Sequence, residues 1–121
     1  MQISQKKLNQ NLKNQIYQLL YQVITDLKNP EEAQLFLESF LSKNELDVMA
    51  RRLGIAYFLN KGKSYSNIKN NLAVSSTSIA AVAQLIKKDK GAKVALEKIH
   101  AEEWADKWAN RLTGMMKLGH K

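Results

Sequence analysis

Residues 64–88, SYSNIKNNLAVSSTSIAAVAQLIKK, carry the pattern that decides the fold. Ser64 suits the cap of a short helix that runs to Leu72, and Ser75 or Ser76 suits the cap of a second helix of about twelve residues. Two capped helices joined by a turn of about four residues have the layout of a helix-turn-helix. The apolar residues expected in the seam between them are Tyr65, Ile68, Leu72, Val74, Ile79 and Val82. The residues expected to face outward are Ser76, Thr77, Ala80, Ala81 and Gln84.

Around this motif the chain is predicted to be helical, because its only proline is Pro30 and strand-like alternation is absent. Apolar steps of three and four predict a first helix over about residues 5–28. Asn29 and Pro30 suit the cap and first position of a second helix of about eleven residues. The capping-box pattern at 42–45 predicts a third helix from about Lys43 to the glycine at 62. A sixth helix is expected over about residues 92–113, so residues 1–113 are predicted to form one all-helical domain and 114–121 a flexible tail.

Positive charge is concentrated around the motif. The chain has 19 basic and 11 acidic residues, a formal net charge of +8. From Arg51 to Lys93 there are nine basic residues and one acid, Asp89, whereas the rest of the chain is balanced. A localised positive field favours a polyanionic partner, because each neutralised phosphate releases counterions. A solvated basic surface is the alternative at this stage.

Other functional classes lack the residues that they need. The chain has no cysteine, which excludes disulfides and thiolate chemistry. No spacing assembles a nucleophile with its base, and no glycine-rich phosphate loop is present, so we predict no catalytic residues and no cofactor. His100, Glu97 and Glu103 can share a helix face, but a solvated surface is the expected interpretation and no metal site is predicted. No apolar run reaches the roughly 20 residues of a membrane span and no secretion signal is present, so a cytoplasmic protein is expected.

Residues 36–82, FLESFLSKNELDVMARRLGIAYFLNKGKSYSNIKNNLAVSSTSIAAV, resemble the Trp repressor-like family. The capping box, the RRLGIAYFLNKGKSYSNI core and the LAVSSTSI turn occur in the family's order, and the likeness extends over about residues 10–96. The resemblance implies a six-helix fold and an intertwined homodimer that places its fifth helix in the major groove of duplex DNA. It also implies a transcription regulator, a repressor, associated with the nucleoid. The apolar stripe of the first helix independently indicates a second copy of the chain, because it is too apolar for a free surface helix. The predicted interface residues are Leu12, Ile16, Leu19, Leu20, Val23 and Leu27.

The resemblance also assigns DNA-binding roles within the motif. Phosphate-contacting and groove-facing positions fall on Lys69, Ser76, Thr77, Ser78, Ala80 and Lys87. With the neighbouring caps and lysines, the candidate set is Lys63, Ser64, Lys69, Ser75, Ser76, Thr77, Ser78, Ala80, Gln84, Lys87 and Lys88. Because residues 76–83 lack Arg, Asn and Lys, direct base readout is expected to be thin, and DNA shape and half-site spacing would add selectivity. The family turn usually has glycine where Ala73 stands, which costs about 1 kcal/mol if that site needs a positive φ.

The tryptophan pocket of the Trp repressor maps onto Leu41, Ser42, Arg52 and Ala81. In that pocket two arginines would hold the indole and carboxylate, and here Ala81 replaces one of them. We therefore predict a tryptophan-independent regulator without a small-molecule effector.

Two further hypotheses remain open. The poverty of base readers favours a non-specific, architectural DNA-binding protein, which would bind unrelated duplexes almost equally. Alternatively, the chain is a protein-interaction module that has kept the fold and uses a carboxy-terminal apolar stripe. That stripe, which otherwise packs in the core or the dimer, consists of Trp104, Trp108, Leu112 and Met115.

Overall fold

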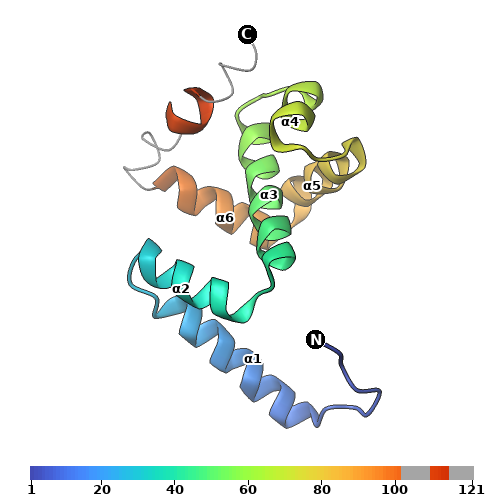
Figure 1. Ribbon diagram of the computed structural model, residues 1–121, viewed down its shortest axis with the longest axis vertical. Coiled ribbons are helices and arrows are strands. Elements are labelled where there is room, and N and C mark those ends of the chain that lie inside the picture. The colour runs from blue at the N-terminus through green and yellow to red at the C-terminus, as the bar shows by residue number, and fades with distance from the viewer. Residues whose placement is uncertain (102–109, 115–121) are drawn as a thin grey trace. The chain divides into compact units, whose positions relative to one another are not determined.

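The computed structural model describes residues 1–101 and 110–114, and the expectation of an all-α fold is confirmed there (Figure 1). Helices α1 to α6 follow one another in the predicted order, and these residues contain no strand. Residues 110–114 form a further helical turn. The chain divides into two compact units, residues 1–43 and 44–121, while the single domain over 1–113 stays a prediction.

The first unit contains α1 (Gln10–Thr25) and α2 (Pro30–Phe40). Helix α1 is shorter than the predicted range of 5–28, because the Asn9 side chain accepts a hydrogen bond from the amide of Leu12, at 3.2 Å, and so fixes the first turn. Helix α2 begins as predicted: the Asn29 side chain accepts from the amide of Glu32, at 2.8 Å, and Pro30 is the first helical residue.

Neither helix of this unit has a buried residue. Leu19 in α1 is 64% exposed, and Leu35 and Phe40 in α2 are 70% and 77% exposed. Most of the apolar stripe of α1 is exposed in the same way. Val23 and Leu27 are half-buried. An amphipathic helix whose apolar face is uncovered forgoes the burial that normally stabilises it.

The second unit is built on α3 (Lys43–Asn60), which begins where the capping-box pattern predicted. The helix ends at Asn60 and is followed by Gly62, whose φ of +82° is the left-handed conformation expected there. The amide of Gly62 donates to the carbonyl of Leu59 and that of Lys63 to the carbonyl of Phe58, each at 3.0 Å. This pair of bonds is a Schellman motif, so the backbone itself satisfies the last carbonyls of α3.

Helices α4 (Tyr65–Leu72) and α5 (Ser76–Lys88) form the predicted helix-turn-helix, capped by Ser64 and Ser75. Helix α6 (Lys90–Ala101) begins two residues earlier than expected, because the carboxylate of Asp89 accepts from the amide of Ala92, at 2.9 Å, and starts the helix there. For the same reason α5 ends at Lys88, close to the predicted length of about twelve residues.

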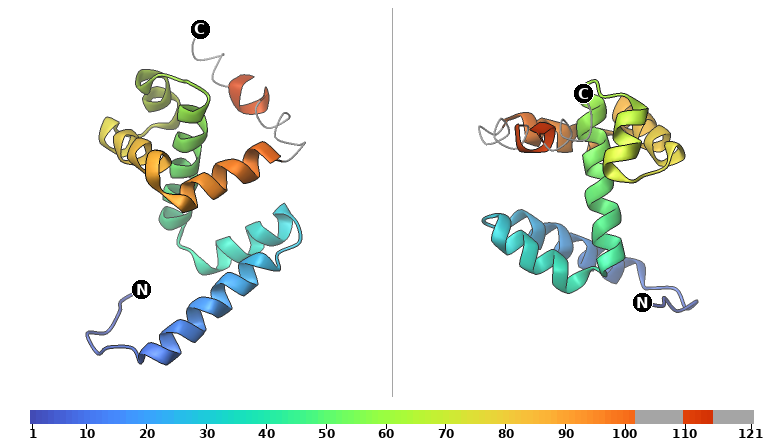
Figure 2. Two further views of the ribbon diagram at one scale, coloured as in Figure 1. Left: turned by 180° about the vertical axis from the view of Figure 1, so that it is seen from behind. Right: turned by 45° about the horizontal axis from the view of Figure 1, so that its top comes forward.

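The core of the second unit lies between α3 and the three helices that follow. Ile55, Phe58, Ile68 and Ile79 are its largest fully buried side chains. The other members are Ala56, Tyr57, Val82 and Leu96, with Leu59, Leu72, Val74, Ile86, Ile99 and Leu112 packed against them. Figures 1 and 2 show α4 and α5 on one side of α3 and the carboxyl end of α6 on the other. The core therefore holds the helix-turn-helix at one edge of the unit.

Candidate nucleic-acid interface

Buried side chains fix the angle between α4 and α5. Ile68 and Ile79 are completely buried and Val82 is 4% exposed, while Leu72 and Val74 are packed against this cluster. Tyr65 is a correction to the predicted seam: it is 44% exposed, because it is the first residue of α4 and lies at the edge of the packed face. With that exception, the helix-turn-helix has the interior that its apolar spacing predicted.

The turn between the two helices passes through Ala73, whose φ of 53° and ψ of 52° are left-handed. Among the residues that the structure describes, Ala73 is the one residue other than glycine that has a positive φ. A Cβ in this conformation lies too close to the following carbonyl, which is why the position favours glycine. Ala73 therefore occupies the conformation that glycine would adopt without strain.

A side chain from α3 holds this turn. The Nη1 atom of Arg51 donates to the carbonyl of Leu72, at 3.1 Å, and to the carbonyl of Ala73, at 2.9 Å. The Nε atom of the same guanidinium lies 2.9 Å from Oδ2 of Asp47, one helical turn earlier. On the neighbouring surface of α3, a Cβ built on Gly54 would lie 3.3 Å from Cδ1 of Leu72, so the glycine allows α4 to approach closely. The sequence did not reveal this role of Arg51.

All five α5 residues that the spacing predicts to face outward are exposed: Ser76, Thr77, Ala80, Ala81 and Gln84. Ala81 is a correction, because it lines a pocket on the side of α5 that faces α3. Ser75 and Ser78, also in the candidate DNA-binding set, contact each other. The Ser75 hydroxyl accepts from the amide of Ser78, at 3.1 Å, and the two hydroxyl oxygens lie 3.0 Å apart. Ser64 caps α4 in the same way, at 3.1 Å from the amide of Asn67. These three serines therefore have a structural role beside any contact with DNA.

Lysines flank the outward face, and the segment from Lys61 to Lys88 contains no acidic residue. Lys69 lies in the last turn of α4, and Lys87 and Lys88 lie in the last turn of α5. All three are exposed, whereas Lys63 is half-buried where the chain leaves α3. A docked helix pair would meet phosphates at such positions.

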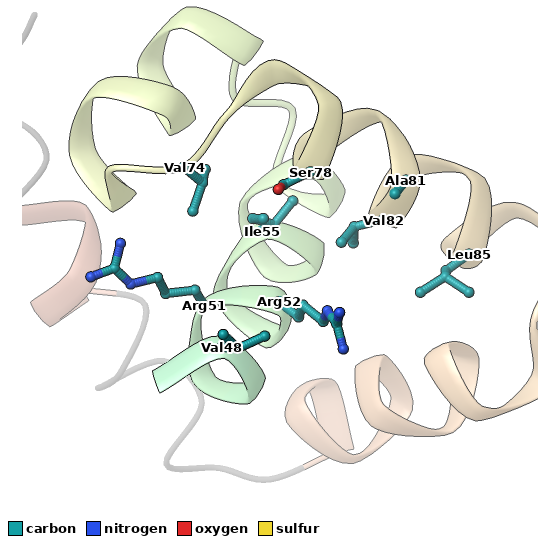
Figure 3. Close-up of a pocket in the computed structure, with 9 residues that line it drawn as sticks. All are labelled: Val48, Arg51, Arg52, Ile55, Val74, Ser78, Ala81, Val82 and Leu85. Carbon is teal, nitrogen blue, oxygen red and sulfur yellow. The ribbon is translucent and has the colours of Figure 1, made fainter. Parts of the chain in front are cut away.

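A pocket of about 410 Å³ lies between α3 and the helix-turn-helix (Figure 3). Its lining is mainly apolar and includes Val48, Ile55, Val74, Val82 and Leu85, together with Ser78, Ala81, Arg51 and Arg52. In Figure 3 the two arginine side chains diverge, Arg51 on the side of Val74 and Arg52 toward Leu85.

The pocket brings together two of the four positions assigned to an effector, Arg52 and Ala81. Leu41 and Ser42 belong to the first unit. Of the other candidates, the His100 ring lies with Nε2 2.8 Å from Oδ1 of Asn60, which joins α6 to the end of α3. Glu103, Trp104, Trp108 and Met115 lie outside the described residues, while Leu112 packs against the core.

None of the helices in the described part of the chain combines the length and apolar content that crossing a bilayer requires. The family model described as Trp repressor protein matches residues 15–100. A Bacillus subtilis (strain 168) protein, described as the uncharacterized protein YerC, is 28% identical over 85 residues, which cover 69% of this chain and 82% of the relative. No solved structure matches the chain significantly.

Proposed function

Since this chain belongs to the Trp repressor family, we propose that it is a transcription regulator that binds duplex DNA as a homodimer, with α5 in the major groove. One observation carries the proposal. The exposed face of α5 is held at a fixed angle by the buried Ile68, Ile79 and Val82, and it is flanked by lysines of a segment, residues 61–88, that contains no acidic residue. A rigid helix with a polar, small-residue face and flanking cations has the shape and charge that docking in a groove requires.

Base recognition in this proposal is sparse. Thr77 and Ala80 offer methyl groups to thymine, Ser76 offers a hydroxyl, and Gln84 can bind adenine through two hydrogen bonds. The remaining selectivity comes from half-site spacing and from the energy of deforming DNA, which depends on sequence at positions that the protein does not touch. The bound dimer represses by covering promoter DNA.

The proposed dimer partner is a second copy of this chain, which covers the apolar stripe of α1. Support comes from the exposure of the four members Leu12, Ile16, Leu19 and Leu20, each 43% exposed or more. Leu19→Lys places an ammonium in the middle of the stripe and should convert the dimer to monomer in sedimentation velocity. Gln18→Lys, an exposed neighbour outside the stripe, is the matched control and should leave the dimer intact. An unchanged sedimentation coefficient for Leu19→Lys would remove α1 from the interface.

The regulator acts without tryptophan in this proposal. Arg52 supplies one cation at the pocket, but Ala81 has no side chain that can stack on an indole or pair with a carboxylate. Addition of L-tryptophan should therefore leave both the melting temperature and the DNA affinity unchanged. A rise in either with increasing tryptophan would contradict this part of the proposal.

Charge reversal at Lys69 and Lys87 tests the DNA interface. The duplexes are first enriched from genomic DNA of the source organism with the wild-type protein, and affinity is then measured by fluorescence anisotropy at one fixed salt concentration. Lys69→Glu/Lys87→Glu should abolish binding. Lys6→Glu/Lys98→Glu lowers the net charge by the same amount at two residues outside the candidate DNA-binding set and should bind far more tightly than the first double variant. Equal losses in the two double variants would show that net charge alone acts.

A second candidate function is architectural, sequence-independent DNA binding, favoured by the small residues of the α5 face. The same enrichment separates the two. Recovery of a few fragments with two half-sites about one helical turn apart supports the regulator. Uniform recovery of all fragments, with a steep dependence on salt, supports the architectural protein.

A further inference from the structure

We propose that Arg51 is a positioning residue for DNA recognition: its guanidinium, anchored by Asp47, holds Ala73 in the left-handed conformation and so sets where the first turn of α5 is presented. This inference rests on the proposed function, because it concerns the helix proposed to enter the groove. It assigns no contact between Arg51 and DNA.

The two left-handed turns in the described residues, at Gly62 and Ala73, end their helices by different means. At Gly62 the backbone amides of Gly62 and Lys63 satisfy the carbonyls of α3. At the end of α4 the Arg51 side chain does so instead, through the carbonyls of Leu72 and Ala73. The turn with glycine, after α3, is capped by backbone amides, whereas the turn with alanine, after α4, is capped by the Arg51 side chain of α3.

The guanidinium is suited to this task because its donors have a fixed planar arrangement. Asp47 occupies Nε, at 2.9 Å, which leaves Nη1 directed at the two carbonyl oxygens. The carbonyls of Leu72 and Ala73 can both accept from Nη1 of Arg51 only while Ala73 keeps its φ of 53°. The two hydrogen bonds therefore stabilise this conformation relative to a turn with a negative φ at Ala73.

The position of the recognition face depends on the same conformation. Two residues separate Ala73 from α5, and the second of them, Ser75, is its cap. A change of φ and ψ at Ala73 therefore rotates the cap and the exposed Ser76 and Thr77 that follow it. If only a fraction of molecules holds the docking geometry, the measured affinity falls by that fraction.

The first test uses the protein without DNA. In Arg51→Met, hydrogen exchange at the amides of Ser78 and Ile79, whose acceptors are both in Ser75, should accelerate, while exchange at the core amide of Phe58 should not. Lys98→Met, which removes an exposed cation from the last turn of α6, is the matched control. Unchanged exchange at Ser78 and Ile79 overturns the inference even if the protein proves not to bind DNA.

The second test asks whether glycine replaces the need for Arg51. Arg51→Met should weaken DNA binding about tenfold or more. Ala73→Gly in the same chain should restore most of the affinity, because glycine adopts the left-handed conformation without steric strain. The dependence of affinity on salt should keep its slope in both variants.

Two outcomes would overturn the inference here. If Arg51 contacts phosphate directly, its loss lowers the salt slope by about 0.9 for each contact and Ala73→Gly restores nothing. If Arg51→Met binds as wild type, the turn does not need its donor. Should Arg51→Met fail to fold, Asp47→Asn keeps the cation and removes its anchor, and faster exchange at Ser78 and Ile79 then supports the inference while unchanged exchange rejects it.

Discussion

Replacing Ala73 with glycine should stabilise the protein. Ala73 has a φ of 53° and a ψ of 52° at the end of α4, where an L side chain costs about 1–2 kcal/mol relative to glycine. Glycine in turn loses more conformational freedom on folding than alanine does, which lowers the free energy of unfolding by about 0.5–1 kcal/mol. The difference leaves a gain of about 0.5–1 kcal/mol in the free energy of unfolding.

The measurement is thermal and urea unfolding followed by circular dichroism at one fixed protein concentration. For a domain of about 60–100 residues, that gain raises the melting temperature by about 2–8 °C, with the urea slope unchanged. The control is the same chemical change in a right-handed helix. Ala50→Gly, at an exposed position inside α3, should lower the stability by about 1 kcal/mol.

The sign of the change in unfolding free energy for Ala73→Gly shows whether Ala73 is left-handed in solution. If Ala73→Gly destabilises the protein as Ala50→Gly does, the left-handed conformation is not the one that the turn adopts in solution. Arg51 would then have no left-handed turn to stabilise.

Three further substitutions test the packing and the caps. Ile68→Ala removes a completely buried side chain and should cost about 2–5 kcal/mol of unfolding free energy; a loss below about 1 kcal/mol in urea titration would mean that the seam between α4 and α5 is not closely packed. Asn29→Ala should cost about 1 kcal/mol and lower the helix content by circular dichroism, whereas Asn70→Ala, at an exposed position inside α4, should not; similar losses would argue against the Asn29 cap. Ser75→Ala should likewise lower the free energy of unfolding by about 1 kcal/mol in urea titration, whereas Ser66→Ala, on the surface of α4, should change it by less than about 0.5 kcal/mol. An unchanged stability of Ser75→Ala would contradict the hydrogen bond between Ser75 and Ser78.

The parts of the fold that could be predicted are those with local causes. The caps Asn29, Ser64 and Ser75 each accept a hydrogen bond from the amide three residues ahead, and Pro30 is the first residue of its helix. A short window of sequence therefore contains the whole interaction. The limit of α1 was predicted less well, because the spacing of Leu8 extends the apolar stripe beyond the point where the Asn9 cap begins the helix.

The role of Arg51 had no local signal. Its partners Leu72 and Ala73 are 21 and 22 residues away, so only the fold brings them together. The sequence did offer one clue, an alanine where the family turn usually has glycine, but nothing in the spacing indicates which side chain stabilises that turn. The same limit applies to the candidate DNA-binding residues: charge and exposure select them, while contacts with a nucleic acid depend on a partner.

The absence of any buried residue in α1 and α2 has a consequence for how the proposed regulator responds to its own abundance. Helices of 16 and 11 residues without a covered face are marginal by themselves in water. In the proposed homodimer, the ordering of residues 1–43 and their pairing with a second chain form one equilibrium, so dilution destabilises this unit just as heating does. If the protein is the proposed dimeric regulator, a small rise in copy number would therefore add to the number of dimers and complete their folding at the same time, so that occupancy of DNA would climb more steeply than the amount of protein.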